Sequence, residues 1–188
     1  TKVEAYHFDI RKHLVEYDDV VNKHREVIYA ERRKILSGAD LKANIQDMVR
    51  DELQGLVYAH LGDEHGDDWD LDGLVAGIGI ILPLPAHLNK DALSQMSRKE
   101  VERKILEYAD SLYEERELEA QNMGVLERLV MLRAIDRRWV EHLTAMENMR
   151  QGIGLQALAQ RDPLVAYKRG GHEMFQNAMA DVRHDIVH

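Results

Sequence analysis

The sequence predicts an all-α protein, in which long amphipathic helices carry one small inserted subdomain. Apolar residues recur at steps of three, four and seven along most of the 188 residues, the period of helices that bury one face. Only 3 prolines are present, and long helices need few. The one sheet element that the sequence admits is a short strand at residues 78–82, and no repeat of 20–50 residues is found.

Residues 8–36 predict the first long helix. One face carries regularly spaced apolar residues, with arginine and lysine between them: Leu14, Tyr17, Val21, Ile28 and Ile35. Ser37 and Gly38 interrupt this pattern, and Asp40 is suited to cap a second helix that runs to about residue 61. We interpret residues 1–61 as a helical scaffold with a kink near residues 37–40.

Residues 62–122 predict the inserted subdomain, because the composition changes abruptly at residue 62. The acidic segment GDEHGDDWDLDG is followed by an apolar run that contains Pro83 and Pro85. Ser97 and Glu100 have the spacing of a capping box, which predicts a helix from about Arg98 to Asn122.

Residues 123–188 predict an antiparallel helical hairpin. Apolar residues recur at helical spacing in residues 125–150 and again in residues 164–187, and a short connection favours neighbouring antiparallel helices. The same pattern predicts that Trp139 lies in the core. The connection is QGIGLQALAQRDP, residues 151–163.

This connection combines apolar residues with basic ones. Gly152 and Gly154 flank Ile153 and indicate that the helix ends there, and Leu155 and Leu158 do not continue either helix face with the expected spacing. We therefore expect Ile153, Leu155 and Leu158 to lie outside the core. Residues 150–169 carry four basic residues against the single acidic Asp162, namely Arg150, Arg161, Lys168 and Arg169. Such a tip suits contact with an acidic or membrane-adjacent partner. A loop folded back onto the inserted subdomain explains the residues equally well.

Composition excludes several classes of protein. The formal net charge of −9 argues against nucleic acid as a partner, which clustered basic residues would bind. Cysteine is absent, so disulfides and thiolate metal sites are excluded, and a reducing intracellular setting fits best. The longest apolar run, residues 75–82, is far shorter than the roughly 20 residues that span a bilayer. Because the chain has no initiating methionine and no signal core, we expect a piece of a longer, unexported protein.

Two groups of residues have metal-ligand spacing. Residues 68–73 match the first half of a calcium loop, but Gly79 stands where the bidentate glutamate is needed, so an acidic loop with an aspartate helix cap is the better interpretation. His184 and His188 lie four residues apart, and His60 and His65 lie five apart. Neither pair has a third ligand at a convincing spacing. We therefore predict no metal site.

Catalytic signatures are absent from the sequence. No phosphate-binding loop, GxGxxG, GxSxG or HExxH motif occurs. Asp18 and Asp19 are adjacent, and adjacent helical residues point about 100° apart, so we expect polar contacts from them rather than acid–base chemistry.

Two motifs resemble the SecA preprotein translocase ATPase family. FDIRKHLVEYDDVVNKHREVIY, residues 8–29, is similar to the start of the family's long central helix. WVEHLTAMENMRQGIGLQALAQRDPLVAYKR, residues 139–169, is similar to the run that ends in its two-helix finger, and Met174-Phe175 matches the pair that follows. The motifs lie in the family's order, about 100 residues apart.

The resemblance implies a helical scaffold at residues 1–61, a helical wing at residues 62–122, and a scaffold return with the finger at residues 123–188. It implies that the long helix couples the nucleotide state of the motor domains to the rest of the protein, with contacts from Tyr17, Asp18, Asp19 and Arg25. It further implies that the finger restrains ATP hydrolysis in the resting enzyme.

The family's fingertip enters the mouth of the SecY channel beside the moving polypeptide. The resemblance assigns this contact to Ile153, Leu155 and Leu158, with Arg150, Arg161, Lys168 and Arg169 as a basic collar. The family usually has tyrosine where this chain has Leu158 and arginine where it has Gln156. Leu158 keeps an apolar surface but loses ring stacking and the phenolic hydrogen bond.

The resemblance also implies cofactors, partners and location. ATP and Mg²⁺ belong to motor domains outside these residues, so we expect a region without catalytic residues or a cofactor of its own. The expected partners are the SecY channel complex, unfolded preproteins, the protein's own motor domains and anionic lipids. The expected location is the bacterial cytoplasm and the cytoplasmic face of the inner membrane.

Two rival hypotheses come from other functional classes. The first is a freestanding helical adaptor whose apolar loop docks a folded partner. The second is a metal-dependent hydrolase that uses the acidic loop and the terminal histidines.

Overall fold

The structure, a computed structural model, describes residues 2–38, 40–62, 69–156 and 163–188. Within these residues, the side chains of 2–14 and 154–156 are not described. Every element of the described ranges is helical, which confirms the predicted all-α class. The chain forms two compact units, Thr1–Ala39 with Val130–Arg183, and Asp40–Leu129 with His184–His188. In the described part of the chain, no helix is both long enough and apolar enough to cross a membrane.

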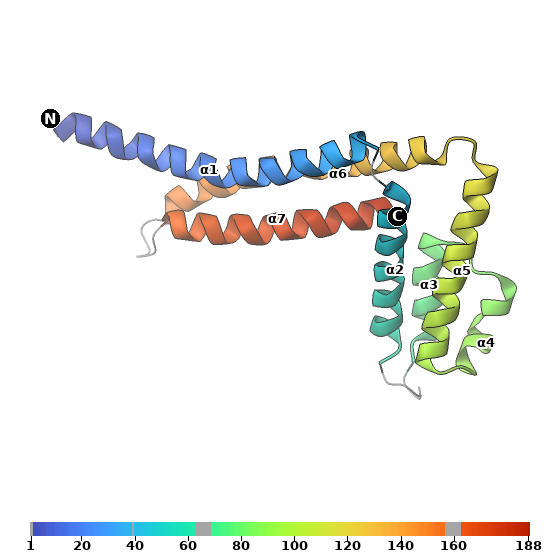
Figure 1. The fold of residues 1–188 in the computed structure, drawn as a ribbon. Helices are drawn as coiled ribbons and strands as arrows, with labels where there is room; N and C mark the ends of the chain where they lie inside the picture. Colours follow the sequence, from blue (N-terminus) through green and yellow to red (C-terminus); the bar gives the residue numbers. More distant parts are fainter. Residues whose placement is uncertain (1, 39, 63–68, 157–162) are drawn as a thin grey trace. The chain divides into compact units, whose positions relative to one another are not determined.

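The first unit contains α1 (Lys2–Leu36) and most of the two hairpin helices, α6 (Met123–Gln156) and α7 (Pro163–Val187). Figure 1 shows α6 and α7 as the long arms of a hairpin, with α1 running beside them. Pro163 is the first helical residue of α7, where its missing N–H costs no hydrogen bond. The predicted hairpin is therefore present.

Helix α6 extends further than the sequence predicts, and this changes the position of Ile153. The helix continues through Gly152 to Gln156. Ile153 is only 8% exposed and packs in a core cluster with Met146 and Tyr167. The expectation that Ile153 lies outside the core is therefore wrong, because two glycines in a helix cost only about 1 kcal/mol each and burial of the isoleucine offsets part of that cost.

The second unit contains α2 (Leu41–His60), α3 (Leu71–Ile81), the 3-10 turn η1 (Ala86–Leu88), α4 (Lys90–Ser94) and α5 (Arg98–Glu119). Helix α2 packs against α3 and α5. Their shared core includes Leu53, Val57, Ile78, Val101 and Ile105, each at most 1% exposed. These contacts group residues 40–61 with α3–α5, whereas the predicted division places them with the first helix.

Side-chain caps begin the helices of the second unit. Asp40 accepts a hydrogen bond from the backbone of Ala43 and caps α2, as predicted. Ser97 and Glu100 form the predicted capping box of α5. Hydrogen bonds from the backbone and hydroxyl of Ser97 lower the pKa of the Glu100 carboxyl. The two predicted starts follow from local hydrogen bonds, which is why the sequence identifies them correctly.

Residues 78–82 are not a strand. Residues 78–81 are the last turn of α3, whose buried residues Leu71, Leu74 and Ile78 follow a step of three and a step of four. Asp70 caps this helix by accepting a hydrogen bond from the backbone N–H of Gly73 at 2.9 Å. The strand prediction is wrong because a short apolar run has no periodicity that separates a strand from a buried helix.

The sequence predicts that an aspartate of the acidic segment caps a helix, and the structure shows that this aspartate is Asp70. Its carboxylate also lies 2.9 Å from Nδ1 of His60. The hydrogen bonds from Gly73 and His60 lower the pKa of Asp70. A Cβ on Gly73 would collide with the Asp70 carboxylate, so this glycine serves the cap. Asp68 and His65 lie outside the described residues.

Two glycines let α7 approach its neighbours closely. A Cβ on Gly171 would lie 2.9 Å from Cε of Met146 in α6 and 3.3 Å from Cγ1 of Val20 in α1. A Cβ on Gly170 would lie 2.8 Å from Sδ of Met149. The Gly170-Gly171 pair therefore marks the line along which α7 contacts the other two helices.

We predict that Gly171→Val lowers the free energy of unfolding by about 1–3 kcal/mol, because the added methyl groups overpack this contact. Gly152→Ala is the control, since no heavy atom lies within 4 Å of its added Cβ; it should raise stability by up to about 1 kcal/mol through helix propensity. Urea unfolding measures both. Equal stability of Gly171→Val and the parent would contradict the close packing.

Candidate functional site: the hairpin packed on α1

A layer of buried rings joins the three helices of the first unit. His24 of α1 lies with its Nδ1 3.0 Å from Nε2 of His142 in α6. The His24 ring stacks on Phe175 of α7, with centroids 4.3 Å apart and planes 2° from parallel. The three residues are 8%, 4% and 7% exposed. We call His24, His142 and Phe175 the ring layer; each helix contributes one of its members.

Burial keeps the histidines of the ring layer neutral. Desolvation, together with the neighbouring His24, lowers the pKa of His142 to about 4. Desolvation, followed by repulsion from His172, also lowers the pKa of His24. A neutral imidazole has one N–H donor and one acceptor, so two neutral rings can share one hydrogen bond. Two protonated rings could not share a hydrogen bond, because both nitrogens of each ring would then be donors.

A second contact lies next to the ring layer. Tyr17 of α1 meets Tyr167 of α7 edge to face, with centroids 4.7 Å apart. Tyr167 is 1% exposed, and burial raises the pKa of its phenol. Tyr17, Val20 and Val21 pack against the cluster of Met146, Ile153 and Tyr167. Tyr17, which the family resemblance assigns to motor coupling, thus also anchors the hairpin.

Polar residues beside this contact line a cavity of about 350 Å³. Arg150 lies 3.7 Å from Asp18 and 2.9 Å from Glu147. Hydrogen bonds from Gln151 and Arg150 lower the pKa of Glu147. Arg25 donates to Asn22 on the same helix and lines the cavity as well. The structure therefore brings Asp18, Arg25 and Arg150 to one place, while Asp19 is exposed and does not line this cavity.

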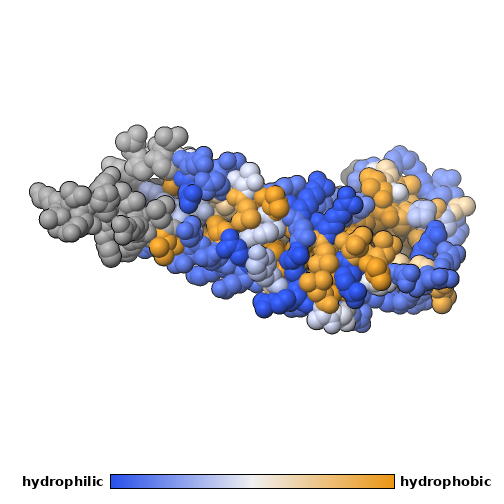
Figure 2. Space-filling view, turned by 90° about the horizontal axis from the view of Figure 1, so that it is seen from above, coloured by the Kyte–Doolittle hydropathy of each residue, from blue (hydrophilic) through white to orange (hydrophobic). Residues whose placement is uncertain are grey.

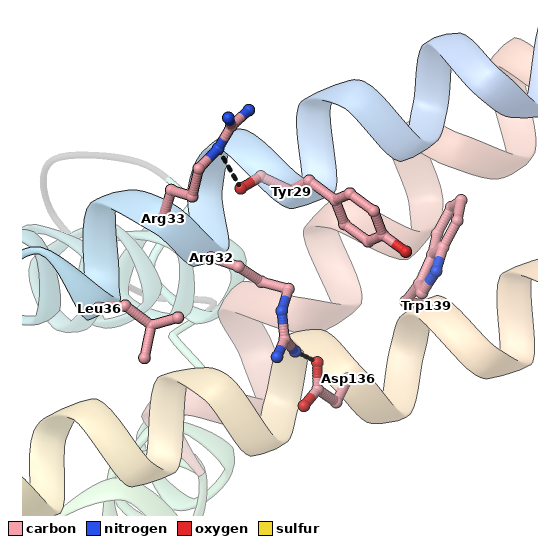
Figure 3. A pocket seen from close by; sticks show the side chains of 6 residues that line it. All are labelled: Tyr29, Arg32, Arg33, Leu36, Asp136 and Trp139. Atoms are coloured by element: carbon pink, nitrogen blue, oxygen red, sulfur yellow. Dashed lines mark hydrogen bonds and ion pairs between the residues drawn. The ribbon is translucent and has the colours of Figure 1, made fainter.

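A groove of about 530 Å³ lies between α1 and α6 (Figure 3), lined by Tyr29, Arg32, Arg33, Leu36, Asp136 and Trp139. Arg32 pairs with Asp136 across it. Tyr29 is 49% exposed. Trp139 is half-buried beside His142, with ring centroids 5.7 Å apart. Trp139 therefore packs on His142 of the ring layer and also lines this groove, so the prediction that it lies in the core is only partly right.

Apolar groups also reach the surface elsewhere. In Figure 2, patches of hydrophobic residues alternate with hydrophilic ones on the face that is drawn. Several large apolar side chains are more than half exposed, including Val15, Val140 and Val165 of the first unit. Exposed apolar residues in scattered groups are normal for a folded protein and do not by themselves mark an interface.

The predicted fingertip is only partly described. Leu155 belongs to α6, and Leu158 and Arg161 lie outside the described residues. Lys168 is exposed, and Arg169 pairs with Glu173 at 3.1 Å. Both Arg150 and Arg169 therefore have glutamate partners, which reduce the positive charge expected of the basic collar.

The terminal histidines meet a residue that spacing alone does not reveal. In the second unit, Oε1 of Glu52 lies 3.2 Å from Nδ1 of His184 and 3.4 Å from Nε2 of His188. The three donor atoms all lie within 4.8 Å of one another. Glu52 is 132 residues from His184 in sequence, so no local pattern could have suggested it.

Comparison with known proteins assigns the family. The family described as SecA Wing and Scaffold domain matches residues 1–188. The chain belongs to the SecA wing and scaffold family. A protein translocase subunit SecA from Dehalococcoides mccartyi is 56% identical over 189 residues, covering 100% of this chain and 20% of that relative.

Other SecA subunits are similar over the same region. A protein translocase subunit SecA from Roseiflexus is 46% identical over 197 residues, covering 100% of this chain and 20% of the relative. One from Pelotomaculum thermopropionicum is 44% identical and covers 99% of this chain and 21% of the relative. The chain thus spans about a fifth of the length of the SecA relatives it matches. These matches confirm the family resemblance that the two motifs indicate.

We predict that acid destabilises the chain through His142. Its pKa falls from 6.5 to about 4 on folding, so the unfolded state binds the proton more tightly; the stabilisation is complete above pH 6.5 and is lost as the pH falls towards 4. Between pH 7 and pH 5 the loss should be on the order of 2 kcal/mol. His142→Gln, which does not titrate, should show a smaller loss in urea unfolding. If the parent and His142→Gln lost the same free energy of unfolding between pH 7 and pH 5, His142 would not be a buried neutral histidine.

Proposed function

We propose that this chain is the scaffold, wing and finger region of a SecA-type ATPase, and that it couples the nucleotide state of motor domains to polypeptide movement into the SecY channel. Membership of the SecA wing and scaffold family supports the translocation role. The observation that carries the coupling is the packing of α1 on both hairpin helices through the ring layer. ATP and Mg²⁺ would bind outside these residues.

The proposed coupling is mechanical. Protein interiors are close-packed and transmit displacement rather than absorb it. Because α1 shares the ring layer and the Tyr17–Tyr167 contact with the hairpin, a displacement of α1 would carry the hairpin with it. Asp18 and Asp19 are exposed on α1 and, with Arg25, are the groups that we assign to contacts with motor domains.

The proposed work of the fingertip belongs to Leu155 and Leu158. Ile153 is buried, so we assign it to holding the base of the tip rather than to touching substrate. An unfolded preprotein presents varied side chains, and apolar residues can contact them without sequence preference. Lys168 and its neighbouring basic residues would face the channel or anionic lipid at the cytoplasmic face of the inner membrane.

The restraint of ATP hydrolysis depends, in this proposal, on a firmly packed hairpin. We predict that Tyr167→Ala raises the rate of ATP hydrolysis by the whole protein in the absence of channel, because loss of a buried aromatic ring loosens the contact by about 3–5 kcal/mol. Val165→Ala, at a residue 61% exposed on the same helix, is the control and should leave the rate unchanged. An unchanged rate in Tyr167→Ala, with faster amide exchange in α7, would contradict the restraint.

The fingertip proposal is tested by disulfide cross-linking, since the chain has no cysteine of its own. Leu158→Cys is introduced into the whole protein, any other cysteine is replaced, and the complex with channel and a stalled preprotein carrying cysteines is oxidised. We predict a disulfide between residue 158 and the preprotein.

The control for this experiment is Glu115→Cys, at an exposed residue of α5, which should not cross-link. If Leu158→Cys never forms the disulfide in a complex that still moves substrate, the loop does not touch the polypeptide. If both variants cross-link alike, the contact is not specific to the loop.

A further inference from the structure

We propose that Glu52, His184 and His188 form a binding site for a divalent transition metal ion such as Zn²⁺. The site lies where the last turn of α7 meets α2, within the second unit. It shares no residue with the ring layer or with the predicted fingertip. The inference does not depend on the proposed role in translocation.

The donor atoms have the separation that a metal ion requires. Zinc binds imidazole nitrogen and carboxylate oxygen at roughly 2.0–2.2 Å in tetrahedral geometry, which places neighbouring donors about 3.3 Å apart. The distances from Oε1 of Glu52 to Nδ1 of His184 and to Nε2 of His188 are 3.2 and 3.4 Å. All three donors lie within 4.8 Å of one another, so one ion can contact all of them with only small side-chain adjustments.

Helical spacing explains why the histidines converge. His184 and His188 are four residues apart, and residues at this spacing lie on the same helix face. Their ring centroids are 4.0 Å apart. Glu52 approaches from α2 and points one carboxylate oxygen at both rings. The set therefore combines a local pair with one long-range residue, as is common in protein metal sites.

The ligand types select the class of ion. Two imidazoles with one carboxylate suit Zn²⁺ and its neighbours in the transition series, whereas Ca²⁺ and Mg²⁺ prefer oxygen ligands alone. Three protein ligands leave a fourth position for water. The side chains of Glu52, His184 and His188 are 35%, 55% and 20% exposed, so an ion can enter from solvent. Bound metal would fasten the last turn of α7 to α2.

The test uses the whole protein, stripped of metal with a chelator and then titrated with Co²⁺, whose visible absorption reports coordination by nitrogen and oxygen. Zn²⁺ is added afterwards to displace it. The parent is compared with the variants Glu52→Gln, His184→Gln and His188→Gln. Metal bound at any other site contributes equally to all four proteins and does not affect the comparison. His172→Gln, at an exposed residue of α7, controls for loss of a histidine as such.

We expect each of the three ligand variants to bind Co²⁺ at least about 10-fold more weakly than the parent, because loss of a group that merely orients a ligand already costs about 10- to 100-fold, or to lose one equivalent. His172→Gln should match the parent. Zn²⁺ should also raise the melting temperature of the parent more than that of Glu52→Gln, because a ligand that binds the native state stabilises it. Equal binding by the parent and all three variants would overturn the proposal, leaving only a histidine–glutamate hydrogen-bond cluster.

Discussion

The ring layer is the contact on which the first unit depends. Each of its three helices contributes one ring, and two of the rings are histidines whose burial lowers their pKa and so favours the neutral form. The adjacent Gly170-Gly171 pair keeps α7 close enough for Phe175 to reach His24. The Tyr17–Tyr167 contact extends the same packing. Without the packing of these rings, α1 would have fewer contacts through which its displacement could move the two hairpin helices.

The second unit is held together by a different kind of interaction. Its core is aliphatic, with Leu53, Leu74, Leu93, Val101 and Ile105 fully buried. Its short helices begin at side-chain caps such as Asp70 and Asn89. An aliphatic core has no titrating group, so the packing of this core, unlike that of the ring layer, should not itself weaken as the pH falls.

Sequence patterns predicted those features that depend on neighbouring residues. Asp40 and the Ser97–Glu100 pair are recognisable as caps, and residues 68–73 as containing an aspartate cap, because each cap acts within four residues. Long-range partners were not recognisable. Nothing near His184 indicates Glu52, and nothing near His24 indicates His142, 118 residues away. Ile153 was misplaced because local glycines suggested a loop, whereas tertiary burial extends α6.

In the proposed coupling, α1 and the hairpin move as one body. A disulfide between Val20→Cys and Gly171→Cys tests this, since a Cβ on Gly171 lies 3.3 Å from the Val20 side chain, within reach of a disulfide. A side chain at residue 171 overpacks against Met146, so rates are compared only between the reduced and oxidised forms of the same variant. The whole protein, with other cysteines replaced, is assayed for ATP-driven preprotein translocation before and after oxidation. If α1 and the hairpin move together, the rates before and after oxidation are equal. A rate that is lost on oxidation and restored by reductant would show that the hairpin must slide along α1, and the proposed rigid coupling would be wrong.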